Sequence, residues 1–248
     1  MREVVFILSV FALIASSCGE ATKKQDETTN REKNDTIIEK GTLTSDIRPN
    51  EKLQIGKTYT DNFEYIDYGA ASEDDFFFDL KKDGKEILLI DGCAKGKTPI
   101  LNRGDMVEIQ WEIKEGNEIF DTTEWAVKIK KTKDGNVSLF KKKYPKPLRY
   151  YYFNEDYSTS LLDEIYKKIE YYLANSKQGL VKVHIDGQNS NLVYSIEDRE
   201  VDGEKYYVVG ISNEFENHTS IIQWIYLSDN LQKIFEYDLP NEKLIEFK

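Results

Sequence analysis

Few side chains in this sequence could carry nucleophilic or metal chemistry. Its 248 residues include only two cysteines and two histidines, namely Cys18, Cys93, His184 and His218. A cysteine nucleophile needs a nearby base, and a zinc site needs three or four ligands at short spacing. Neither histidine has a second histidine or a cysteine at such a spacing. We therefore predict no metal site and no cofactor. We expect Cys93 to be a buried, unreactive thiol, because it follows the apolar run 87–90.

Acidic side chains are so numerous that no catalytic pair stands out among them. The chain carries 45 aspartates and glutamates, and it lacks GxSxG, HExxH and glycine-rich phosphate-loop motifs. The cluster Glu73-Asp74-Asp75 offers oxygen ligands but lacks the spacing of a dedicated calcium loop, so we expect a solvated acidic turn. Glycoside hydrolysis needs two carboxylates flanking a cleft, which a sequence alone does not identify. We predict that the protein is not an enzyme, and a hydrolase with paired carboxylates stays open as the alternative.

Basic side chains are concentrated in one segment of an acidic protein. The formal net charge of −11 argues against a nucleic-acid partner, because phosphate contacts require a basic surface. Residues 128–149, in contrast, hold nine basic side chains and one acidic side chain. The residues that could contact an anionic partner are Lys128, Lys130, Lys141, Lys142, Lys143, Lys146, Arg149, Tyr150 and Tyr152.

Two interpretations of this basic segment compete. In the first, alternate lysines form the solvent-exposed side of edge strands, where they discourage aggregation and offset neighbouring acids. In the second, the segment binds an anionic surface, such as lipid headgroups or an acidic protein, and its tyrosines supply rigid contact area. Salt-sensitive binding that is lost on charge reversal would distinguish the two.

A two-residue period of apolar positions predicts short strands between residues 52 and 140. The runs 76–80 and 86–90 flank Asp83-Gly84, a strong β-hairpin signal. Further strands are predicted by alternation at Val107, Ile109, Trp111 and Ile113, and then at Trp125, Val127 and Ile129. Asp134-Gly135 predicts another hairpin, with a strand over 137–140. Strands of this length and spacing predict a small antiparallel β-barrel or sandwich.

The second half is predicted to combine one helix with a sheet. Residues 160–176 carry an apolar stripe at helical spacing, with Ser158 or Ser160 as the N-cap. Glu164–Lys168 and Asp163–Lys167 have the spacing of ion pairs on the exposed face. Alternation then predicts an antiparallel meander of five strands over 180–185, 192–196, 205–211, 220–227 and 232–237. The predicted fold class is α+β and mostly β, with the sheet packed on the helix.

The N-terminus resembles the signal peptide of bacterial lipoproteins. Arg2 precedes an apolar run over 4–15 that is too short to span a bilayer, and the run ends in Ala15-Ser16-Ser17-Cys18. This ending is a relaxed lipobox, since the family favours leucine where this chain has Ala15. The resemblance implies cleavage before Cys18, a diacylglycerol group on its sulfur and a fatty acid such as palmitate on its amino group. A lipidated Cys18 leaves Cys93 without a disulfide partner.

These observations predict a division of the chain into five segments. Residues 1–17 form the signal peptide, and 18–50 form the lipidated cysteine and a polar, disordered tether. Residues 51–140 form a β-rich domain, and 158–248 form the domain with the helix and the antiparallel sheet. The connector over 141–157 is basic and aromatic, and we expect it to bury either Tyr150 and Tyr152 or Tyr151 and Phe153.

A weaker resemblance concerns the C-terminal part. The segments 221–226 and 233–238 resemble the closing hairpin of small cystatin-like or PepSY-like domains in secreted bacterial lipoproteins. This resemblance implies binding or inhibition rather than catalysis.

The sequence thus predicts a membrane-anchored lipoprotein of the cell envelope that acts as a non-enzymatic binding, assembly or inhibitor module. Gly19 follows Cys18 where some bacteria use aspartate for inner-membrane retention, so we expect the outer membrane. The expected partners are the membrane, through the lipid anchor, and an anionic protein, lipid headgroup or envelope glycan. A hydrolase and a purely structural envelope component are the alternatives.

Overall fold

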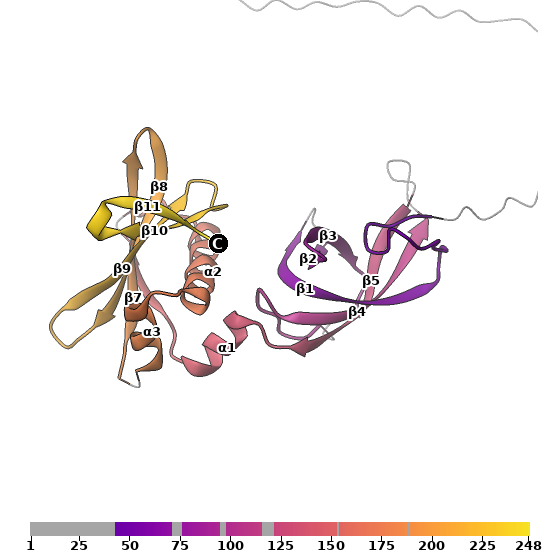
Figure 1. Cartoon of the computed structure of the whole chain (residues 1–248), viewed down its shortest axis with the longest axis horizontal. Helices are drawn as coiled ribbons and strands as arrows, with labels where there is room; N and C mark the ends of the chain where they lie inside the picture. Colours follow the sequence, from indigo (N-terminus) through magenta and orange to yellow (C-terminus); the bar gives the residue numbers. More distant parts are fainter. Residues whose placement is uncertain (1–42, 71–75, 95–97, 116–121, 153, 188) are drawn as a thin grey trace, which may run out of the picture. The chain divides into compact units, whose positions relative to one another are not determined.

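The computed structural model describes residues 43–70, 76–94, 98–115, 122–152, 154–187 and 189–248. These residues are mostly β-structure, with two sheets and three α-helices (Figure 1). The predicted α+β, mostly β class is therefore confirmed at this level. All the described residues belong to one compact unit. The predicted lipobox with Cys18 and the acidic cluster over 73–75 lie outside the described residues.

The first sheet contains the four strands that the sequence analysis expected before residue 134, together with β1, for which no strand was specified. They are β1 (Thr58–Ala70), β2 (Phe76–Lys82), β3 (Lys85–Asp91), β4 (Met106–Glu115) and β5 (Thr122–Lys133). They pair in the order β1-β2-β3-β5-β4, and β4 also pairs with β1, so that the pairing closes on itself. The β3–β5 pair is parallel, which the antiparallel prediction missed. A closed ring with an odd number of strands cannot alternate direction throughout, so at least one pair must be parallel.

The core of this sheet follows the predicted alternation in β4 but not in β5. Val107, Ile109, Trp111 and Ile113 are all buried, as expected. In β5 the buried residues are Ala126 and Ile129, whereas Val127 is exposed. Trp111 pairs with Ala126 and Gln110 pairs with Lys128, so Val127 is the extra residue of a β-bulge. The bulge shifts the alternation by one position, and a two-residue period read from sequence cannot anticipate this shift.

Residues 43–50 are not part of a disordered tether, which corrects the predicted boundary at residue 50. The backbones of Leu43 and Leu53 form two hydrogen bonds, and Ile47 is buried in the core of the first sheet. The side chain of Arg48 forms an ion pair of 2.8 Å with Asp61 of β1. Apolar burial and this ion pair together outweigh the ordering entropy that the polar composition suggested.

Residues 137–140 are helical, so the strand predicted there is wrong. They belong to α1 (Asn136–Lys143), whose residues Val137 and Phe140 are buried. Tyr144, one turn beyond Phe140, is also buried and stacks on it at 6.0 Å. This spacing is helical, and it was interpreted as a strand because Asp134-Gly135 resembles a hairpin turn. Gly135 instead lies against Gly104, so closely that a side chain at residue 135 would overlap the backbone.

The second sheet has six strands and is covered by the long helix. The strands are β6 (Arg149–Tyr152), β7 (Leu192–Val201), β8 (Glu204–Glu214), β9 (Thr219–Ser228), β10 (Ile234–Asp238) and β11 (Lys243–Phe247), in the spatial order β11-β10-β9-β8-β7-β6. Helix α2 (Thr159–Asn175) lies along this sheet in Figure 1 and shares one apolar core with it. The Ser158 side chain accepts a hydrogen bond of 3.1 Å from the Leu161 backbone N–H, so the predicted helix and cap are confirmed.

Three features of the second half differ from the prediction. Residues 180–185 form helix α3 (Gly179–Asp186) instead of a strand, because Val181 packs into the core while Leu180 and Val183 are exposed. The connector over 141–157 contributes β6, which pairs in parallel with β7. The hairpin of β9 and β10 does not close the sheet, since β11 follows a 3-10 turn at Leu239–Asn241 and pairs with β10.

Candidate ligand cavity

The structure distributes the predicted basic contact residues over three elements. Lys128 and Lys130 are exposed on β5, Lys141–Lys143 end α1, and Arg149 begins β6. Most of these side chains have acidic partners in the chain, as ion pairs Lys141–Glu170, Lys142–Asp134, Lys143–Asp186 and Arg149–Glu214. Lys146 donates a hydrogen bond of 2.9 Å to the Ser190 carbonyl oxygen. The local contacts therefore favour the interpretation in which these bases offset acids of the same protein.

The tyrosines of the connector are only partly buried. Tyr150 packs against the core and stacks on Tyr194 at 5.3 Å. Tyr152 is 43% exposed and Tyr151 is 49% exposed, while Phe153 lies outside the described residues. The expected burial of Tyr150 together with Tyr152 is therefore wrong for Tyr152, because β6 is the edge strand of the sheet.

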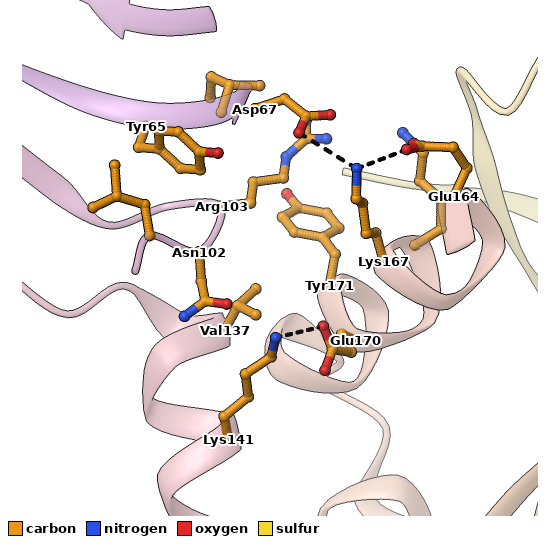
Figure 2. A pocket seen from close by; sticks show the side chains of 13 residues that line it. Tyr65, Asp67, Asn102, Arg103, Val137, Lys141, Glu164, Lys167, Glu170 and Tyr171 are labelled. Carbon is orange, nitrogen blue, oxygen red and sulfur yellow. Dashed lines mark hydrogen bonds and ion pairs between the residues drawn. The ribbon is translucent and has the colours of Figure 1, made fainter. Parts of the chain in front are cut away.

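A different group of charged residues lines a cavity of about 220 Å³. Its walls come from β1, the loop over 101–103, α1 and α2 (Figure 2). Three lining residues are acidic, namely Asp67, Glu164 and Glu170, and four are basic, namely Arg103, Lys141, Lys167 and Lys168. Tyr65, Tyr171 and Val137 contribute rings and an apolar side chain.

Each acid that lines the cavity is paired with a lysine. The ammonium of Lys167 lies 2.7 Å from Glu164 and 3.6 Å from Asp67, so it bridges α2 and β1. The ammonium of Lys141 lies 2.8 Å from Glu170 and joins α1 to α2. Figure 2 shows both sets of contacts at the cavity wall. Asp67 and Glu164 share the single ammonium of Lys167, so the lining as a whole, with four basic and three acidic side chains, keeps a small positive excess.

Two cations of the cavity form no close ion pair with another described residue, although acids lie near both of them. The guanidinium of Arg103 lies 4.7 Å from the centre of the Tyr171 ring, and it forms no ion pair there. Lys168 is half-buried and forms neither a hydrogen bond nor an ion pair with another described residue. Burial and the nearby charge of Arg103 lower the pKa of Lys168. The cavity thus holds two positive groups close together. The charges of Glu164 and Asp67 oppose the fall in the pKa of Lys168, and the charge of Arg103 acts on Asp79.

Tyr65 adds a neutral donor to these cations. Its ring lies at the cavity wall in Figure 2, and its hydroxyl has no hydrogen-bond partner among the described residues. Burial, together with the charges of Asp67 and Asp105, raises the pKa of this hydroxyl, so it stays protonated at neutral pH. Tyr65 is held firmly, because its backbone exchanges hydrogen bonds of 2.8 Å with Gly104 and Asp105.

The loop that carries Arg103 is fixed by a buried carboxylate. Asp105 accepts hydrogen bonds from the backbone N–H groups of Asn102 at 2.8 Å and Gly135 at 2.7 Å. It also accepts one from the ammonium of Lys131 at 2.9 Å, and its side chain is fully buried. Burial opposes ionisation, but the hydrogen bonds, led by that from Gly135, outweigh burial and lower the pKa of Asp105. The side chain of Asp105 therefore holds both the cavity loop and the start of α1 in place.

Sequence reasoning did not single out Arg103, Lys168 or Tyr65. Lys168 was assigned to an ion pair with Glu164 on the exposed face of the helix. In the structure Glu164 pairs with Lys167 instead, which leaves Lys168 at the cavity. No local pattern marks Arg103, since its neighbours in the cavity come from strands and helices distant in sequence.

The residues first considered for chemistry lie elsewhere. Cys93 is half-buried, and burial beside Asp91 raises the pKa of its thiol to about 12. His184 lies on α3 rather than in a strand, with its Nδ1 3.3 Å from the Ser190 hydroxyl oxygen. His218 is exposed and stacks on Phe215. Within the described ranges, no three His, Cys, Asp or Glu side chains are grouped so that they could hold a metal ion.

Comparison with known proteins adds no family assignment. No protein-family model matches this sequence, and no curated protein matches it significantly. Among the residues that the structure describes, no helix is both long and apolar enough to cross a membrane.

Proposed function

We propose that this protein is a lipid-anchored lipoprotein of a bacterial cell envelope, located in the outer membrane. The support is the apolar run over 4–15 and its ending Ala15-Ser16-Ser17-Cys18. Two or more acyl chains on Cys18 give stable membrane attachment, whereas one chain gives only weak and reversible binding. The mature chain then carries its folded part on the aqueous side of that anchor.

The folded part acts as a non-enzymatic binding module for an anionic partner. The observation that carries this proposal is the pair Arg103 and Lys168, which line one cavity and form no ion pair with another described residue. Burying a cation that forms no ion pair costs free energy, and an anionic ligand would offset part of that cost. An acidic protein, a lipid headgroup or an envelope glycan could each supply the anion.

Hydrolysis by paired carboxylates is the second candidate, and the ionisation of the acids argues against it. A general acid at neutral pH needs a raised pKa. The carboxyls whose pKa is raised, chiefly by burial, include Asp79 and Glu124, and neither lines the cavity. The cavity acids are engaged by lysines instead. A purely structural envelope component is the third candidate, and it leaves the unpaired cations without a role.

We also infer the finer architecture. The closed pairing of β1 to β5 supports a small β-barrel rather than a sandwich. The helix α2 and the sheet of β6 to β11, whose apolar core is distinct from that of the first sheet, support an α+β fold of the cystatin-like or PepSY-like kind. Domains of this kind carry functions on surfaces and cavities, so the fold alone assigns none.

The anchor is tested by labelling cells with a palmitate analogue and separating membranes from soluble proteins. Wild type should carry the label and sediment with membranes, and Cys18→Ser should lose both properties. Cys93→Ser is the matched control and should behave as wild type. Retention of label and membrane attachment by Cys18→Ser would show that the protein is not a lipoprotein.

The binding role is tested by thermal unfolding of purified protein with a panel of carboxylates, phosphates and sulfates. At least one anion should raise the melting temperature of wild type but not that of Arg103→Gln/Lys168→Gln. The control Lys128→Gln/Lys130→Gln removes the same charge from exposed positions on β5. If no anion stabilises wild type beyond this control, the binding role is wrong.

A further inference from the structure

We infer that a second pocket, between α1, α2 and α3, binds the anion of a medium-chain fatty acid. This pocket shares no lining residue with the cavity of Arg103 and Lys168. The inference therefore goes beyond the proposed binding function and is tested independently of it. It follows from the apolar lining, the charge at the rim and the size of the pocket.

Half of the pocket lining is apolar. The three helices lie next to one another in Figure 1, and five of the ten lining residues have apolar side chains, namely Leu139, Phe140, Leu173, Ala174 and Ile185. Phe140 and Leu173 belong to the core of the second sheet, whereas Leu139 is 52% exposed. One wall of the pocket is therefore an apolar side chain that the fold leaves uncovered. Binding of an alkyl chain would remove this apolar surface from water, which is favourable.

The uncharged polar side chains of the lining already have hydrogen-bond partners. The Asn136 amide donates a hydrogen bond of 2.7 Å to the Asn175 side-chain oxygen. The Ser176 hydroxyl donates to the Tyr172 hydroxyl oxygen at 3.2 Å and accepts from the Gln178 backbone N–H at 3.2 Å. A ligand rich in polar groups would lose its hydrogen bonds to water and find few replacements here. The pocket therefore favours an alkyl chain over a sugar or a nucleobase.

The rim of the pocket carries one positive charge in excess. Its charged residues are Lys143, Lys182 and Asp186. Lys143 and Asp186 form an ion pair, whereas the side chain of Lys182 forms neither an ion pair nor a hydrogen bond with another described residue. Asp186 follows Lys182 by one helical turn, so its charge is counted against both lysines. The sum of two positive charges and one negative charge suits a single carboxylate at the rim.

The size of the pocket limits the length of the alkyl chain. The volume is about 240 Å³. A methylene group takes up about as much space as a water molecule, so this volume holds roughly eight such groups at about 30 Å³ each. A much longer chain would extend into solvent. Octanoate, with one carboxylate and an apolar chain of this length, is therefore the probe that matches the pocket.

Calorimetric titration with octanoate at pH 7.5 is the direct test. The parent protein is the full chain with Cys18→Ser, so that no acyl group of the anchor competes, and octanoate stays below its micelle-forming concentration. Leu139→Gln should bind octanoate at least about fourfold more weakly than the parent, which corresponds to the loss of one buried methylene. Leu180→Gln is the matched control, because Leu180 is 53% exposed and does not line the pocket. Equal binding by the two variants, or no binding by the parent, would overturn the inference.

Uncharged and cationic probes test the role of the rim charge. Lys182→Gln should weaken the binding of octanoate but leave that of octanol unchanged, because octanol carries no charge. Lys177→Gln removes an exposed lysine that does not line the pocket, and it should change neither affinity. The parent should bind octylamine more weakly than octanoate. If octylamine binds as tightly as octanoate, or if Lys182→Gln weakens octanol and octanoate equally, the ligand is not an anion held by Lys182 and the inference is wrong.

A series of fatty acids tests the size of the pocket. From butanoate to octanoate the affinity should rise about fourfold for each added methylene, and it should level off for longer chains. An affinity that does not depend on chain length contradicts an alkyl chain in the pocket.

Two other occupants of the pocket would give different results. If a second copy of the chain covers Leu139, the parent sediments as a dimer and Leu139→Gln as a monomer. If a bilayer covers Leu139, the parent binds vesicles of phosphatidylcholine and phosphatidylglycerol, and Leu139→Gln does not. Either result without octanoate binding overturns the inference. Circular dichroism reports whether each variant is folded, and if Leu139→Gln is not, the comparison of Lys182→Gln with Lys177→Gln decides.

Discussion

Replacing Asp105 by asparagine should destabilise the protein substantially, because this one buried carboxylate accepts hydrogen bonds from three separate donors. Its oxygens accept hydrogen bonds from Asn102 and Gly135 backbone N–H groups and from the Lys131 ammonium. The substitution keeps the shape of the side chain but removes the charge and one acceptor oxygen. Lys131 then loses its buried acid and keeps Asp134, at 3.0 Å, and the Ser138 hydroxyl, at 3.2 Å. The cost combines a broken ion pair with an unsatisfied N–H group.

The magnitude follows from the burial of the two partners. Removal of one partner from a buried ion pair costs about 3–5 kcal/mol, and an unsatisfied buried donor costs about 1–3 kcal/mol. The side chain of Asp105 is fully buried, but that of Lys131 is 25% exposed and keeps a second acid. We therefore expect about 3 kcal/mol, near the lower end of the range for a buried pair.

The loss should depend on pH with a definite sign. The pKa of Asp105 is lowered in the folded protein, whereas an unfolded aspartate titrates near about 3.9. The carboxylate therefore contributes its full stability above the unfolded pKa, and this contribution disappears as the pH falls through the folded pKa. The difference between wild type and Asp105→Asn should be largest at pH 7 and should shrink below about pH 4.

Urea unfolding followed by tryptophan fluorescence measures this difference at pH 7 and at acidic pH. Asp229→Asn, at an exposed loop position, is the control and should change stability by less than about 0.5 kcal/mol. Asp105→Asn should also weaken anion binding, because the loop that carries Arg103 loses its attachment. A loss below about 1 kcal/mol at pH 7, or an equal loss at low pH, would refute the assignment of Asp105 as an ionised anchor.

Two other predictions concern Lys168 and Cys93. Lys168→Met should raise the free energy of unfolding by up to about 1 kcal/mol, because it removes a half-buried charge that forms no ion pair. It should also abolish anion binding. Urea unfolding and calorimetry measure these two effects, and a clear loss of stability would show that Lys168 has a structural partner. Cys93 should react with iodoacetamide at pH 8 far more slowly in folded than in urea-unfolded protein, because burial raises its pKa to about 12. Equal rates in the two states would show that this thiol is accessible and ionised.

Sequence periodicity correctly predicts those helices and strands that bury the side chains of one face only. In β4, every second residue from Val107 to Ile113 is buried, so the alternation in sequence reports the core directly. Helix α2 is equally regular, since Ile165 and Ile169 point into one core and Ser158 caps its start. The hairpin at Asp83-Gly84 was likewise predicted, because the positive φ angles of its turn favour these residue types.

Prediction failed where a long-range contact decides between helix and strand. The segment 137–140 is short and apolar, and periodicity over four residues does not separate the two states. The helix α1 begins where it does because Gly135 packs on Gly104 and donates to Asp105. Neither partner is local in sequence. In α3, burial of Val181 in the core favours the helix over a strand. The helix leaves Val183 exposed.

The cavity could not be predicted from the sequence, for a related reason. Its cations are ordinary residues in their local context, and Lys168 has an acid one helical turn away. Lys168 forms no ion pair with that acid, Glu164, because Glu164 pairs with Lys167 instead, at 2.7 Å. The same lysine also reaches Asp67 on β1, a contact that exists only in the folded chain. A sequence lists the candidates for pairing but does not show which of them are left unpaired.

The pairing of cations separates the two basic regions of this protein. Four bases at positions 141–149 have acidic partners, so binding an external anion there would first require an existing ion pair to break. Arg103 and Lys168 require no such exchange, and their mutual repulsion falls when an anion enters. An anion that enters the cavity therefore gains the attraction of both cations without breaking an ion pair of either.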